Sequence, residues 1–146
     1  MGIGLTCEDT ECFYSYPFWQ DVRIELAKAT MQYLKIIKTT LPRNADLDDL
    51  VTATPASLFS DIYLFHYQTF RRYRNILTSN GLEGIYALLD RSDTEGEYSI
   101  GNCHDIVRGI KSVKHCIRDP DIMDAIPELL KVFEASIRLG KNVKIV

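Results

Sequence analysis

The chain has 146 residues, of which 46% are hydrophobic and 25% charged, and its formal net charge is −3. This length is typical of one domain, and eight Tyr and six Phe at modest net charge exclude an intrinsically disordered chain. No apolar run reaches the ~20 residues that a membrane span requires. An acidic chain is not attracted to nucleic acid or anionic lipid over its whole surface, so only a local patch could bind either.

Residues 1–16 are expected to form a flexible N-terminal arm that leads into a first helix. Pro17 suits a first helical turn, and apolar residues then recur every three or four positions as far as Leu41. Pro42 ends this helix, because the residue before proline avoids the helical conformation.

Three further segments precede residue 102. A central helix with a wide apolar face is expected from Pro55 to residue 79, ended by Asn80-Gly81. A shorter helix is expected over 82–90, with Leu82, Ile85, Leu88 and Leu89 directed inward. The polar segment 91–101 is typical of a mobile loop.

Asn102 is expected to cap a helix that continues to about residue 118. Its core positions recur at helical spacing and are Ile106, Ile110, Val113 and Ile117. Arg108 and His115 are expected on the opposite, solvated face. Gly109 costs this helix about 1 kcal/mol relative to alanine, which indicates a close contact with another helix.

The last helix is expected to start at Asp119-Pro120 and to end at Gly140, and Pro127 is a point where it could divide. Residues 141–146 alternate like a strand but have no evident partner strand. They are interpreted as a tail that packs Val143 or Ile145 on the helices.

These elements predict an all-α fold, a single-domain up-and-down bundle of about five helices joined by short connections. Its parts are the arm (1–16), the helical bundle (17–140) and the tail (141–146).

Metal and cofactor binding are not expected. The soft and imidazole ligands fall in two zones and are Cys7, Cys12, Cys103, His104, His115 and Cys116. His104 and His115 would lie ~16 Å apart along one helix, too far to share an ion with bonds of about 2 Å. His66, on the central helix, is interpreted as a packed residue rather than a cofactor ligand. Free thiols in a reducing cytoplasm are the simpler interpretation of the four cysteines.

The first residues, Met1 to Thr6, fit the N-myristoylation pattern with Gly2 as the acceptor, and Cys7 follows as a second acylation site. One acyl chain binds a membrane only marginally, and the acidic Glu8 and Asp9 would be repelled by an anionic leaflet. No signal peptide is expected either. A cytoplasmic protein is therefore predicted, with anchoring by acylation at Gly2 and Cys7 as the alternative.

Arg108 and His115 are separated by six residues on a predicted helix. This spacing resembles the Arg-x4–6-His motif of HEPN ribonucleases, although Gly109 stands where a polar residue usually follows the arginine. The resemblance covers eight residues and implies RNA cleavage in which a histidine moves a proton and an arginine stabilises phosphorane charge. The other interpretation is a solvated charged face opposite the core.

Phe70 and Tyr73 alternate with Arg71, Arg72 and Arg74, a composition able to stack bases and hold phosphates. If this face adjoins the charged face of the next helices, a composite anion site results. Its members would be Arg71, Arg72, Arg74, Arg108, Lys111 and Arg118.

The sequence therefore favours a non-enzymatic interaction protein that binds another macromolecule, in first place a protein or a second copy of itself. Exposed rings at the N-terminal arm are the expected anchor, since Tyr and Trp supply large amphipathic contact area. These residues are Phe13, Tyr14, Tyr16, Phe18 and Trp19. The alternative is RNA binding or HEPN-like cleavage through Arg108 and His115.

Overall fold

The computed structural model describes residues 2–37, 75–90 and 96–146, and every element below belongs to these parts. The elements follow in the order β1 (Gly2–Cys7), β2 (Thr10–Ser15), α1 (Tyr16–Ile36), α4 (Glu83–Asp90), β3 (Gly96–Tyr98), α5 (Ile100–Val113), the 3₁₀ turn η2 (Lys114–Cys116), α6 (Pro120–Leu139) and β4 (Val143–Ile145). Residues 75–79 are also helical. The rest of the expected central helix lies outside the described residues.

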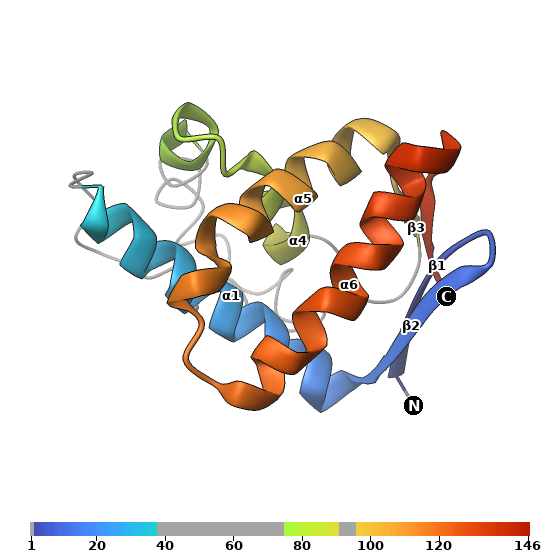
Figure 1. Ribbon diagram of the computed structural model, residues 1–146, viewed down its shortest axis with the longest axis horizontal. Coiled ribbons are helices and arrows are strands. Elements are labelled where there is room, and N and C mark those ends of the chain that lie inside the picture. The colour runs from blue at the N-terminus through green and yellow to red at the C-terminus, as the bar shows by residue number, and fades with distance from the viewer. Residues whose placement is uncertain (1, 38–74, 91–95) are drawn as a thin grey trace, which may run out of the picture.

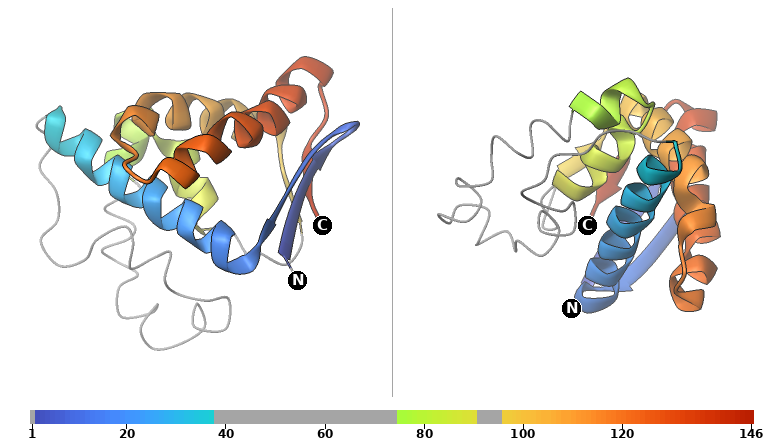
Figure 2. Two further views of the ribbon diagram at one scale, coloured as in Figure 1. Left: turned by 60° about the horizontal axis from the view of Figure 1, so that its bottom comes forward. Right: turned by 90° about the vertical axis from the view of Figure 1, so that its left-hand side faces the viewer.

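The prediction of an all-α helical bundle is wrong. Four strands form an antiparallel sheet in the order β2-β1-β4-β3. Figures 1 and 2 place α1, α4, α5 and α6 on one side of this sheet. The buried side chains of both layers form one apolar core, in which Trp19, Tyr98 and Phe133 are among the largest members.

Residues 2–15 are not a flexible arm but a hairpin, β1 paired with β2 from Gly2↔Ser15 to Cys7↔Thr10. Alternate side chains of β1 point into the core: Ile3, Leu5 and Cys7 are buried. Of the positions that alternate with them, Gly2 and Gly4 have no side chain, so the alternation is hard to recognise in the sequence. Glu8 supplies the positive φ of 55° in the turn.

The C-terminal tail is also a strand, and it does have partners. β4 lies between β1 and β3 and pairs with both in antiparallel register. Val143 and Ile145 are buried, as the alternation predicts. β3 lies within the segment that was expected to be a mobile loop, and its Tyr98 side chain is buried against Phe133 with ring centroids 5.5 Å apart.

The helices agree with the sequence more closely. α1 has Pro17 in its first turn and Ser15 as its N-cap, and it ends at Ile36, before the predicted Leu41. All four inward residues predicted for 82–90 are buried, as are the four core positions predicted for 102–118. The cap of α5 was wrongly assigned, because Ser99 Oγ accepts the Asn102 N–H at 3.1 Å.

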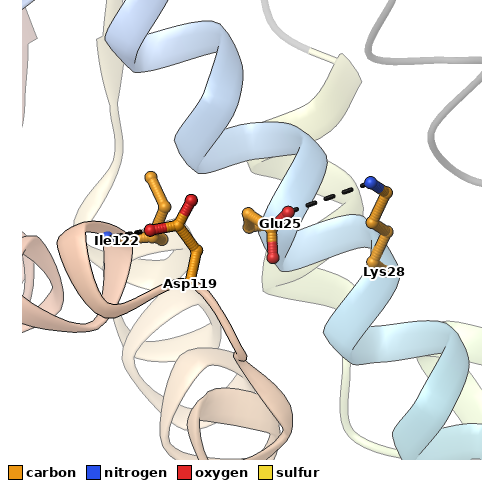
Figure 3. Close-up of polar contacts among 4 residues, drawn as sticks. All are labelled: Glu25, Lys28, Asp119 and Ile122. Atoms are coloured by element: carbon orange, nitrogen blue, oxygen red, sulfur yellow. Dashed lines mark hydrogen bonds and ion pairs between the residues drawn. The ribbon is translucent and has the colours of Figure 1, made fainter.

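α5 ends at Val113, earlier than predicted, and η2 carries the chain to Ile117, which is extended. α6 then begins with Asp119 as its N-cap, whose carboxylate accepts the N–H groups of Asp121 and Ile122. Figure 3 shows the bond from Ile122 to Asp119. The same view shows the ion pair between Glu25 and Lys28 on α1, 3.8 Å apart.

α6 remains one helix through Pro127 and ends at Gly140, which adopts φ 65°. Proline has no N–H for the carbonyl of residue i−4, here Met123. The exposed position of Pro127 leaves this carbonyl next to water, so an undivided helix is tolerated.

Two glycines let α4 and α5 cross closely. A Cβ on Gly84 would lie under 3.0 Å from the backbone of Asp105 and Ile106. A Cβ on Gly109 would lie 3.0 Å from Cγ1 of Ile85, which confirms the close contact expected there.

Candidate functional site

The aromatic residues expected to anchor a partner are split between core and surface. Trp19 is 1% exposed and stacks on Tyr14 at a centroid distance of 5.8 Å, and Tyr14 is itself buried between β2 and α6. Phe18 is half-buried and lies 5.6 Å from Tyr14. Only Phe13 and Tyr16 of the five present an exposed ring.

Phe13 is 70% exposed on the outer face of the sheet, but it has a local structural role. Phe13 is the register partner of Gly4 on the neighbouring strand β1. A Cβ added to Gly2 would lie 2.8 Å from Cζ of the Phe13 ring. The ring therefore covers backbone that the two glycines leave bare, an arrangement that stabilises glycine-containing sheets.

Only three of the six predicted anion-binding residues, Arg108, Lys111 and Arg118, lie in the described part of the chain. Arg71, Arg72 and Arg74 lie outside the described residues, as does His66. Arg108 is exposed and its guanidinium lies over Gly81, where a Cβ would be 2.9 Å from Cζ. Arg118 is exposed beyond η2.

His115 is exposed, as predicted, but it belongs to η2 rather than to the helix that carries Arg108. Its ring stands edge-on to Tyr33 of α1, with centroids 6.3 Å apart and an interplanar angle of 80°. Arg108 and His115 thus contact different elements, the Gly81 turn and α1.

The cysteines are free thiols; Cys7, Cys12 and Cys103 are buried and Cys116 is half-buried. Cys103 donates to the Tyr98 carbonyl with Sγ and O 3.8 Å apart. Burial raises the pKa of all four thiols, which keeps them protonated at neutral pH. Within the described ranges, no group of three His, Cys, Asp or Glu side chains is arranged to hold a metal ion.

Among the described residues, a hollow with a largely apolar lining lies between α5–η2 and α6 and is called the α5–α6 groove below. Its volume is about 610 Å³. It is lined by Lys111, Lys114, His115, Ile117, Met123, Ile126, Pro127, Leu130, Lys131 and Glu134.

The floor of the α5–α6 groove is apolar. Ile117, Ile126 and Leu130 are buried, whereas Met123 is 48% exposed. The α6 positions on this surface recur at helical spacing from residue 123 to residue 134, which spans about 16 Å along the axis. The apolar members of this lining, from Met123 to Leu130, span about 10 Å, so the groove offers an apolar strip about two turns long.

The rim of the α5–α6 groove is basic on both sides. Lys111 and Lys114 stand on the α5–η2 side and Lys131 on the α6 side. Lys111 Nζ lies 3.1 Å from Glu134 Oε1. In the described part of the chain, no ion pair engages Lys114 or Lys131.

Sequence reasoning singled out Lys111 and His115 of this site and missed the apolar floor. The signal was present in α6: Met123 and Pro127 are apolar residues four apart, just outside the core stripe of the same helix. The sequence does not show that Met123 and Pro127 line a groove, because the opposite wall belongs to α5 and η2. These elements lie beside α6 only because the chain turns back at Ile117, which is extended.

Comparison of the chain with models of protein families, with curated protein sequences and with solved structures gives no match. Within the described residues, no helix combines the length and the apolar character that crossing a bilayer demands. The function is therefore inferred from the α5–α6 groove itself.

Proposed function

We propose that this protein is a non-enzymatic interaction protein whose α5–α6 groove binds an amphipathic helical segment of a partner protein. The observation that carries the proposal is an open apolar strip on α6, with the half-exposed Met123 at its N-terminal end. Amphipathic helices bind such grooves through apolar side chains spaced three and four residues apart.

The dimensions of the groove support a helical occupant. The groove lining spans about 16 Å along α6, which matches three turns of a partner helix, and a volume of about 610 Å³ holds several partner side chains. Methionine adapts its shape to different apolar partners, which suits a docking surface. The free thiols support a place of action in the reducing cytoplasm.

The test uses a fluorescent peptide of about 20 residues, because isolated helices shorter than about 12–15 residues are only marginally stable in water. The peptide carries leucine at positions spaced three and four apart and glutamine on its flanks. Covering the exposed half of Met123 is worth about 1 kcal/mol, so Met123→Gln should weaken binding about fivefold. Fluorescence anisotropy measures the dissociation constant.

Leu139→Gln is the matched control, because Leu139 lies on the same helix, is 41% exposed and is not part of the groove. This variant should bind the peptide as the unchanged protein does. An equal loss in both variants, or no peptide binding at all, contradicts the proposal. Binding or cleavage of a single-stranded RNA, abolished by His115→Ala, would instead establish the alternative function.

A further inference from the structure

We infer that the partner helix of the α5–α6 groove is acidic, with carboxylates on both flanks of its apolar face. This inference rests on the proposed function and specifies the chemistry of the partner. Its basis is the sign of the charge around the groove, which is opposite to that of the chain.

The charge of the groove lining is positive although the whole chain is negative. Three lysines and one glutamate line the groove, whereas the formal net charge of the protein is −3. Glu134 is already engaged by Lys111 at 3.1 Å. Two ammonium groups, those of Lys114 and Lys131, are thus left for an incoming ligand.

These two lysines stand on opposite walls. Lys114 belongs to η2 and Lys131 to α6, and both are exposed. A helix lying on the floor between them has its two flanks directed toward one ammonium group each. Carboxylates on both flanks would therefore pair with the rim, while lysines there would be repelled by it.

The acidic residues Asp124 and Glu128 are exposed on α6 but are absent from the groove lining. Glu128 lines a separate hollow beside β2, and Lys131 lies between the two hollows, since it lines both. The Asp119 carboxylate accepts N–H groups at the start of α6. His115 is a further rim residue.

The experiment compares three versions of the leucine-faced peptide that differ only in flanking residues: glutamate, glutamine and lysine. Each exposed lysine–carboxylate pair is worth up to about 1 kcal/mol, or fivefold. The glutamate peptide should therefore bind about tenfold more tightly than the lysine peptide at low ionic strength. Half-molar salt should remove most of this preference, because it shortens the Debye length to a few ångströms.

Charge-reversal variants test which residues cause the preference for the glutamate-flanked peptide over the lysine-flanked peptide. Lys114→Glu and Lys131→Glu should each reduce it about fivefold or more. Lys144→Glu is the matched control, because Lys144 is exposed on β4, lies outside the groove and changes the net charge equally. Far-UV circular dichroism verifies that all three variants fold.

The possible outcomes separate this inference from the proposed function. Equal binding of the three peptides overturns the acidic-partner inference and leaves helix binding intact. The same loss with Lys144→Glu as with the rim variants also overturns it, since the effect would then reflect net charge. Failure of all three peptides to bind overturns both proposals.

Discussion

Replacing Gly84 by alanine should separate α4 from α5 and destabilise the protein. The added Cβ would lie under 3.0 Å from the Asp105 carbonyl group and the Ile106 nitrogen. These are backbone atoms within α5, so no side chain can rotate away, and the two helices must move apart. Overpacking of this kind costs up to about 3 kcal/mol.

Alanine also favours a helix over glycine by up to about 1 kcal/mol, which offsets part of this cost. The expected net loss is about 2 kcal/mol in the free energy of unfolding. For a chain of this size, each 1 kcal/mol lowers the melting temperature by about 2–4 °C. Thermal unfolding followed by circular dichroism should therefore show a decrease of about 4–8 °C for Gly84→Ala.

Gly101→Ala is the matched control, because Gly101 is the second residue of α5 as Gly84 is of α4. A Cβ there meets only Ser99 Oγ, at 3.9 Å, so the melting temperature should stay within about 2 °C. Equal melting temperatures for the two alanine variants would refute the close backbone contact.

Three further predictions concern buried polar groups. The free energy of unfolding should fall as the pH rises above about 10. Burial raises the pKa of Tyr14 above its ordinary value of 10.0, so at that pH only the unfolded chain releases the phenol proton. In urea titrations at pH 8 to 11, Tyr14→Phe should flatten this decrease. Among the thiols, Cys116 should react first with a disulfide reagent at pH 8, while the buried Cys103 should react only after unfolding. Mass spectrometry of peptides identifies the labelled cysteine. Labelling of Cys103 before unfolding would contradict its place in the core. Arg23 is 3% exposed and donates to the Leu89 carbonyl near the end of α4. Arg23→Met should therefore lower the free energy of unfolding by about 1–3 kcal/mol. An unchanged midpoint in urea unfolding would show that this hydrogen bond contributes nothing.

The helical part of the fold was predictable because each helix carries its own periodic signal. Ile106, Ile110, Val113 and Ile117 recur at helical spacing, and all four are buried. Local caps were readable too, as with Asp119-Pro120 before α6. Asn102 was mistaken for a cap because a Ser–x–x–Asn sequence contains two residues of capping type, and Ser99 is the one used.

The sheet was not predictable because its pairing is non-local. β4 alternates clearly, but its neighbours are β1, at the opposite end of the chain, and the three-residue β3. Gly2 and Gly4 hide the alternation of β1, since a strand normally shows polar side chains at such positions. The groove has the same difficulty, because Lys114 and Lys131 face each other only once α5 and α6 have packed.

The most direct test of helix binding at the α5–α6 groove is a methyl NMR titration with the glutamate-flanked peptide, using protein labelled at Ile, Leu, Met and Val methyl groups. We expect the largest shift changes at Met123, Ile126 and Leu130, with little change at Val146 on the outer face of the sheet. Changes concentrated at Val146, or spread evenly over the core, would contradict the assignment of the groove as the binding site.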